Sequence, residues 1–167
     1  MACTCSFFFD EGGTQAQCVA KPNDGSFENQ LTDVIRMPWV VEGRGGIDRG
    51  KNLGQSGRNN AWIRNNTGWN GIRQAVRLNA GDTYTLKGFV RTSGNVRDGY
   101  FGFRDSYQKP VSEIKYGPLP SYTQLKVQYR PTVSGTYYIF TGIWALNQDS
   151  WAQTDNFVLL YPCGDTE

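Results

Sequence analysis

The sequence of 167 residues has no histidine, no long hydrophobic run and no block of lysine or arginine. Without histidine, neither a Ser–His nor a Cys–His catalytic pair can form. No apolar stretch approaches the roughly 18 residues of a membrane-spanning helix, so we expect no membrane insertion. The arginines are scattered and the net charge is only +2, which argues against a nucleic-acid partner. The length suits a single domain with a substantial core.

Four cysteines lie near the ends of the chain, and the long middle part has none. Cys3 and Cys5 are too close in sequence to bond comfortably to each other, so we expect each to reach Cys18 or Cys163. Such a bond would join the first and last strands, and it indicates an oxidising, secreted or extracellular setting. The one-residue spacing of the first two cysteines and the lack of histidine make zinc the weaker interpretation.

The hydrophobic pattern is that of β-strands, with short apolar runs about every ten residues between Gly, Pro and Asn. Alternation is clear in residues 84–91 and 125–130, where one face is apolar and the other polar. This predicts an all-β fold, a two-sheet antiparallel β-sandwich or jelly roll. We expect a domain over residues 22–163, preceded by a disulfide-anchored arm over residues 1–21. The predicted strands are Ser26–Asn29, Trp39–Glu42, Ala61–Arg64, Gly71–Leu78, Thr83–Thr92, Gly99–Arg104, Val111–Tyr116, Thr123–Arg130, Thr136–Ala145 and Gln153–Tyr161.

Most of the five tryptophans lie among Asn, Asp, Gln and Gly rather than in aliphatic runs. A flat aromatic ring beside amide groups suits a sugar, which has an apolar face and a rim of hydroxyls. Trp69 stands in a segment that resembles a loop, and Trp144 and Trp151 flank another polar stretch. Trp39 is the exception: it follows a proline and precedes two valines, so we expect it in the core.

Three stretches in order resemble the jelly-roll carbohydrate-binding modules of families four, nine, sixteen and twenty-two. They match an opening "N-G-x-F-E … W", a middle "W-x-G-x-x-Q … L-x-x-G-x-x-Y-T-L" and a closing "G-x-W … D-x-W-x-x-x-D-D-x-x-L". The matching segments are 23–28 with Pro38-Trp39, then 68–74 with 78–86, and finally 142–144 with 149–151 and 154–157. The resemblance implies a module that binds a polysaccharide in an aromatic groove, performs no catalysis and can belong to a larger enzyme.

The resemblance also implies a structural calcium ion between the first and last strands. The matching metal positions are Glu28 and Asp155, whose oxygen atoms suit calcium. The family's second aspartate is Asn156 in this chain, so one charge is missing from the usual set.

Residues expected to contact the polysaccharide are aromatic side chains for stacking and polar side chains for hydrogen bonds. Arg73 and Arg104 could instead pair with the carboxylate of a uronate, or serve as structural ion pairs. The predicted stacking or lining residues are Trp69, Tyr100, Tyr107, Trp144 and Trp151, and the predicted hydrogen-bonding residues are Arg73, Gln74 and Arg104.

Two other functions remain open from the sequence. A small jelly-roll glycoside hydrolase or lyase would need paired carboxylates, and Glu42 and Glu113 are the glutamates left after the chain ends and the calcium position are set aside. A protein-binding adhesion domain could use the same aromatic surface. We expect no catalysis, because no strand motif places two acids together, and we expect the chain to be a monomer.

Overall fold

The computed structural model describes residues 17–20 and 22–163. Within these residues the chain forms nine strands and no helix, so none is long and apolar enough to cross a membrane. All strand pairs are antiparallel. The strands are β1 (Gln17–Ala20), β2 (Trp39–Glu42), β3 (Gly45–Ile47), β4 (Ala61–Leu78), β5 (Tyr84–Thr92), β6 (Asp98–Arg104), β7 (Pro110–Tyr116), β8 (Thr123–Tyr129) and β9 (Gly135–Pro162).

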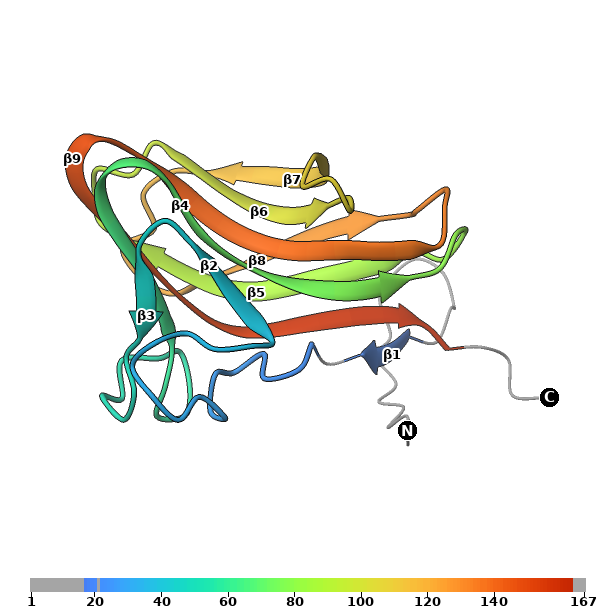
Figure 1. Ribbon diagram of the computed structural model, residues 1–167, viewed down its shortest axis with the longest axis horizontal. Helices are drawn as coiled ribbons and strands as arrows, with labels where there is room; N and C mark the ends of the chain where they lie inside the picture. The colour runs from blue at the N-terminus through green and yellow to red at the C-terminus, as the bar shows by residue number, and fades with distance from the viewer. Residues whose placement is uncertain (1–16, 21, 164–167) are drawn as a thin grey trace.

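Two long strands, β4 and β9, pair along nearly their whole length and curve from one layer of the sandwich into the other (Figure 1). The first layer contains β2, the second half of β4, the first half of β9, β6 and β7. The second layer contains β3, the other halves of β4 and β9, β5, β8 and β1. A register shift between Asn65 and Thr67 marks the crossing.

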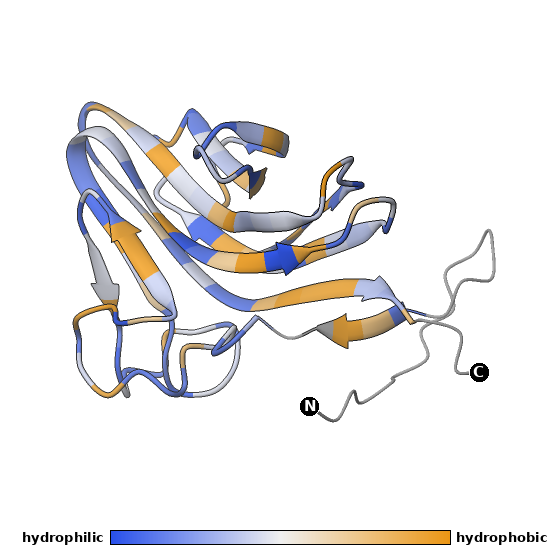
Figure 2. Cartoon of the chain, turned by 45° about the vertical axis from the view of Figure 1, so that its right-hand side comes forward, coloured by the Kyte–Doolittle hydropathy of each residue, from blue (hydrophilic) through white to orange (hydrophobic). Residues whose placement is uncertain are grey.

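The core lies between the layers, and its residues occupy alternate positions of the strands. Phe101 of β6 stacks on Phe157 of β9, with ring centroids 5.7 Å apart, and so joins one layer to the other. Hydrophobic bands follow the strands, whereas the loops at the β3 end are mostly hydrophilic (Figure 2). The predicted antiparallel β-sandwich is therefore confirmed, as are the core positions of Trp39, Phe101 and Phe103.

The strand predictions were wrong where glycine and asparagine occur within strands. Residues 61–64 and 71–78 belong to one strand, as do 136–145 and 153–161. Gly68 in the first and Asn147 in the second take a positive φ, and the ladder between the two strands resumes after the irregularity. The predicted strand Ser26–Asn29 is a turn instead. In it Phe27 has a φ of 60° and is completely buried against Trp39. The short strands β1 and β3 were not predicted.

The disulfide prediction needs a correction. Cys18 bonds to Cys163, so neither is available to Cys3 or Cys5, which lie outside the described residues. The cause is strand pairing: β1 runs antiparallel to the end of β9, and the two Cα atoms are 5.0 Å apart. The expected neighbourhood of first and last strands is confirmed. Strand β1 falls in the region expected as an arm, and residues 1–16 lie outside the described part of the chain.

Candidate functional site

The outer face of the first layer carries a groove of about 470 Å³, here called the aromatic groove. Its side chains come from alternate positions of neighbouring strands, opposite in direction to the core residues of the same strands. The groove is lined by Glu42 of β2, Trp69 of β4, Tyr100 and Arg104 of β6, Gln108, Pro110 and Glu113 of the β6–β7 hairpin, and Phe140 and Trp144 of β9.

Trp69 lies across the floor of the aromatic groove, over two glycines of adjacent strands. A Cβ atom placed on Gly142 would stand 2.3 Å from the Trp69 ring, and one placed on Gly71 would stand 3.1 Å from it. Only glycine leaves room for the ring at the first of these positions. Trp69 donates a hydrogen bond from Nε1 to Glu42 at 3.1 Å. The indole is therefore held at a fixed place on the sheet, half-buried beneath the groove opening.

Aromatic neighbours surround this indole on several sides. The ring centroids of Trp144, Phe140 and Tyr100 lie 5.7, 6.3 and 6.4 Å from that of Trp69. Trp144 keeps 47% of its surface exposed, whereas Phe140 is buried beneath the others. The groove thus offers a fixed, apolar surface with one prominent exposed tryptophan, which suits a ligand with a flat apolar face.

Glu42 organises the polar side of the groove. Its Oε2 accepts a hydrogen bond from Arg73 at 2.7 Å, and its Oε1 accepts one from Arg104 at 2.8 Å in addition to the Trp69 indole. Burial alone would raise the pKa of Glu42, but the hydrogen bonds from Trp69 and Arg104 and the charges of Arg104 and Arg73 outweigh it and lower this pKa. Both arginines therefore form ion pairs with Glu42.

Four of the predicted binding residues line the aromatic groove: Trp69, Tyr100, Arg104 and Trp144. The structure corrects the reason given for Trp69, which belongs to strand β4 and not to a loop. Arg73 lies next to the groove through its ion pair with Glu42, and its guanidinium is 5.4 Å from the Tyr138 ring centroid.

The other predicted binding residues lie elsewhere. Gln74 is 3% exposed and donates to the backbone oxygen of Asn23, because its strand position points to the core. Tyr107 is 90% exposed in the turn between β6 and β7. Trp151 belongs to the second layer and lines a separate cleft.

Sequence reasoning considered Glu42 and Glu113 only as catalytic carboxylates and did not include them among the binding residues. Both line the aromatic groove. Glu113 faces Arg104, whose charge partly offsets the rise in the Glu113 pKa that desolvation causes. Arg73 and Arg104 lie far from Glu42 in the sequence, and only the fold brings them to it. The sequence alone therefore does not reveal the role of Glu42.

The predicted metal positions, Glu28 and Asp155, come together at the loop that precedes β4. Glu28 Oε1 accepts the backbone N–H groups of Arg58 and Asn59, and Asp155 Oδ2 accepts that of Ser56. Burial raises the pKa of Asp155 to about 6; the backbone N–H groups oppose the rise and the charge of Glu28 adds to it. A cation would offset the negative charge of the two carboxylates. The described residues, however, contain no cluster of three acidic, cysteine or histidine ligands.

No protein-family model and no curated protein matches the sequence. The fold, by contrast, matches many solved structures. A cyclase from Fischerella sp. in its apo form has a TM-score of 0.65 and 15% identity over 90% of this chain and 98% of its own. A family 61 carbohydrate-binding module in complex with β-1,4-galactotriose has a TM-score of 0.60 and 16% identity over 81% of this chain and 94% of its own.

An arabinose-bound α-L-arabinofuranosidase matches 92% of this chain with a TM-score of 0.64 and 16% identity. The match spans only 27% of that enzyme's length. Modules of families 4 and 22 also match, with TM-scores of 0.57 and 0.58. The chain therefore has the jelly-roll fold of carbohydrate-binding modules. The resemblance to families four and twenty-two is confirmed at the level of the fold.

Proposed function

We propose that this chain is a non-catalytic carbohydrate-binding module that holds a neutral, β-linked polysaccharide in the aromatic groove. The observation that carries the proposal is the position of Trp69, fixed flat over Gly142 and anchored to Glu42. A sugar ring can stack its C–H face on such an indole, with Trp144 beside it. The family 61 module of the same fold was solved with β-1,4-galactotriose, which supports a β-linked ligand.

A neutral ligand follows from the charges of the groove. Glu42 neutralises Arg73 and Arg104 within hydrogen-bond distance, so a ligand carboxylate would have to displace an existing partner. The remaining N–H donors of the arginines, the acceptor oxygens of Glu113 and the amide of Gln108 can still bind sugar hydroxyls. Two rings and a few hydrogen bonds would give an affinity between about micromolar and millimolar.

Affinity electrophoresis of the purified chain through gels that contain single polysaccharides tests this function. We expect one or a few neutral β-glycans to retard the chain, and we expect Trp69→Ala and Trp144→Ala to abolish the retardation. Trp62→Ala, outside the groove, is the matched control and should migrate as the wild type does. No retardation by any neutral glycan would refute the proposal and favour a protein partner for this surface.

A glycosidase is the second candidate, because Glu42 and Glu113 line the same groove and their pKa values shift in opposite directions. Opposite shifts are the usual sign of an acid and a partner carboxylate. Glu42, however, already accepts hydrogen bonds from Trp69, Arg73 and Arg104. Its carboxylate therefore suits holding these side chains in place better than attacking a sugar. Release of reducing sugar from a retarding glycan, lost in Glu42→Gln plus Glu113→Gln, would establish catalysis instead.

Calcium at Glu28 and Asp155 is part of the proposal as a structural ion. The raised pKa of buried Asp155 beside Glu28 fits a site that gains from a positive charge. Backbone and amide oxygens would have to complete the set. We further propose that the chain is secreted, where the Cys18–Cys163 disulfide would stay oxidised. In the native protein the module would be linked to a larger enzyme.

A further inference from the structure

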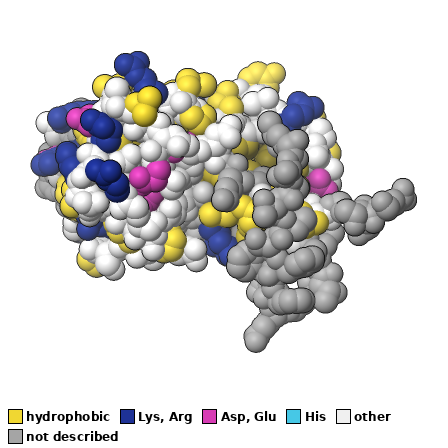
Figure 3. Space-filling model, turned by 90° about the horizontal axis from the view of Figure 1, so that it is seen from below, with side chains coloured by type: hydrophobic (Ala, Val, Ile, Leu, Met, Phe, Trp, Pro, Cys, Tyr) yellow, Lys and Arg dark blue, Asp and Glu magenta, His cyan; other side chains and the backbone are white. Residues whose placement is uncertain are grey.

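A second cleft, of about 580 Å³, lies on the outer face of the second layer and shares no lining residue with the aromatic groove. Basic side chains gather at the end of the molecule where β3 lies, with a few acidic ones among them (Figure 3). The cleft, here called the basic cleft, is lined by Arg44, Asp48, Lys51, Trp62, Ile63, Arg64, Arg91, Trp151, Ala152 and Gln153.

Two half-buried tryptophans provide its apolar surface. Trp62 of β4 is paired with Gln153 of β9, and Arg64 is paired with Trp151, so all four share one face of the sheet. The two tryptophans are diagonal neighbours, whose side chains are roughly 7–8 Å apart at their bases. Trp62 lies flat over a glycine: a Cβ atom on Gly46 would be 2.8 Å from its ring.

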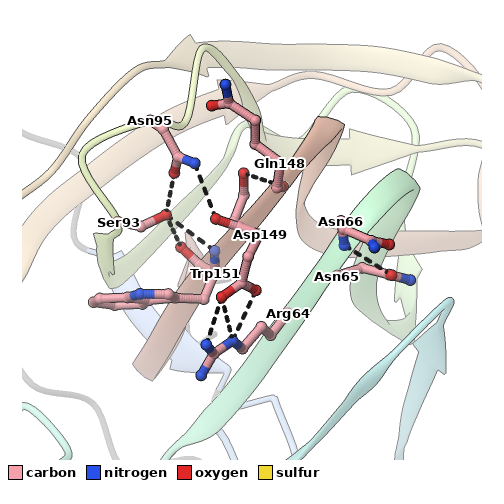
Figure 4. Close-up of polar contacts among 9 residues, drawn as sticks. Arg64, Asn65, Asn66, Ser93, Asn95, Gln148, Asp149 and Trp151 are labelled. Carbon is pink, nitrogen blue, oxygen red and sulfur yellow. Dashed lines mark hydrogen bonds and ion pairs between the residues drawn. The ribbon is translucent and has the colours of Figure 1, made fainter.

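The backbone of Trp151 is held by two hydrogen bonds to Ser93. Its N–H donates to Ser93 Oγ at 3.1 Å (Figure 4). Its carbonyl oxygen accepts the Ser93 N–H at 3.0 Å. Ser93 in turn donates to Asn95 at 2.7 Å, and Asn95 donates to the carbonyl oxygen of Asp149 at 2.9 Å. The basic cleft is thus built on ordered strands, as the aromatic groove is.

The charges of the two sites differ. In the basic cleft Lys51 pairs with Asp48, and Arg64 pairs with Asp149. Arg44 and Arg91 have no carboxylate within ion-pair distance among residues 17–20 and 22–163. The exposed Arg44 guanidinium lies 5.9 Å from the Trp62 ring centroid, whereas Arg91 donates to Gln153. Two cations without carboxylate partners therefore flank the tryptophans.

We propose that the basic cleft is a second glycan site that binds a uronate-containing sugar chain. Trp62 and Trp151 would stack on the sugar rings, and Arg44 and Arg91 would bind the carboxylates. Asp48 and Gln153 line the wall of the cleft, where Asp48 accepts hydrogen bonds from Lys51 and Gln153, and Gln153 accepts one from Arg91. A nucleic acid fits less well, because only two cations of the cleft lack a carboxylate partner and the charge of Asp48 repels phosphates. This proposal does not depend on the function of the aromatic groove.

Indole N–H signals in two-dimensional NMR distinguish the two sites, because the five tryptophans report on separate places. Single Trp→Phe variants assign the signals, and buried Trp39 serves as the internal reference. The probes are trigalacturonate and trimannuronate, their methyl esters and a thymidine hexanucleotide. We expect one or both uronates to shift the Trp62 and Trp151 signals and to leave those of Trp69 and Trp144 unchanged.

The methyl esters remove the charge without changing the sugar ring, so we expect binding to weaken about tenfold or more. Arg44→Gln should weaken uronate binding about threefold to fivefold, as for one exposed ion pair, and salt should weaken wild-type binding. The Arg44 side chain lies near Trp62, and its charge also acts on the exposed Asp149, so its replacement should leave the fold intact. Arg77→Gln, an exposed arginine of β4 in the first layer and away from the basic cleft, is the matched control.

Three results would overturn the proposal. The first is that neither uronate shifts the Trp62 and Trp151 signals. The second is that the methyl esters bind as well as the acids do, and the third is that only the oligonucleotide binds. Neutral glycan binding at Trp69 would be unaffected by any of these results, so failure of this proposal is distinguishable from failure of the proposed function.

Discussion

Replacing Glu42 by glutamine tests the organisation of the aromatic groove, because this carboxylate binds three side chains from three positions in the sequence. Glutamine keeps the size and one acceptor oxygen, but it removes the charge that faces Arg73 and Arg104. Arg104, whose side chain is 9% exposed, would then lose its ion pair and keep only the charge of Glu113 nearby. We expect both the stability of the fold and the affinity for the neutral glycan to fall.

The magnitude follows from burial. An exposed ion pair contributes about 0–1 kcal/mol, and loss of one partner from a fully buried pair costs about 3–5 kcal/mol. The side chains of Glu42, Arg73 and Arg104 are 19%, 26% and 9% exposed, so this cluster lies between the two cases. We expect Glu42→Gln to lower the free energy of unfolding by about 2 kcal/mol, which corresponds to about 4–8 °C in Tm for a chain of this size.

The pH dependence gives a second measure of the same interaction. The pKa of Glu42 is lowered from 4.5 in the folded protein. Its contribution to stability is therefore fully present above pH 4.5 and is lost as the pH falls through the lower, folded value. Thermal unfolding by circular dichroism should show a gap between wild type and Glu42→Gln at pH 7 that narrows below pH 4.5. Equal Tm values at pH 7, with equal glycan affinity, would refute this reasoning.

Three further predictions concern the floor, the disulfide and the metal. Gly142→Ala places a methyl group against Trp69, so we expect glycan affinity measured by calorimetry to fall at least about fivefold, whereas Gly135→Ala, in open space, should bind normally. The Cys18–Cys163 bond joins residues that are 145 positions apart in the sequence. Its reduction should lower the free energy of unfolding by up to about 5 kcal/mol in the chain-entropy model. An unchanged denaturant midpoint after reduction would contradict this prediction. Calcium should raise the Tm above that in EDTA, and equal Tm values would remove the proposed ion.

Sequence reasoning was sufficient where a residue's role depends on its own strand. The alternation of β5, β6 and β8 and the core positions of Phe101 and Phe103 could be predicted, because side chains of a strand alternate between two faces. Trp69 and Trp144 could also be identified as candidate binding residues. They stand directly opposite each other on β4 and β9. The family-like segments pointed to both residues but did not predict that they are paired.

The parts that failed depend on contacts between distant strands. Gln74 resembled a hydrogen-bonding residue, but the register of β4 directs it to the core, and a shift of one residue decides this. Arg73 and Arg104 are 31 residues apart, and only folding brings both to Glu42. Trp151 was assigned to the groove because it follows Trp144, yet the bend in β9 carries it to the other layer.

The central claim is that Trp69 and its neighbours bind a neutral glycan without cleaving it. Isothermal titration calorimetry of wild type, Trp69→Ala and Trp62→Ala with the glycan that retards the chain tests it most directly, with the products analysed for new reducing ends. The account predicts saturable binding by wild type and Trp62→Ala, none by Trp69→Ala, and intact glycan in every case. Undiminished binding by Trp69→Ala, or glycan cleaved by the wild type, would contradict it.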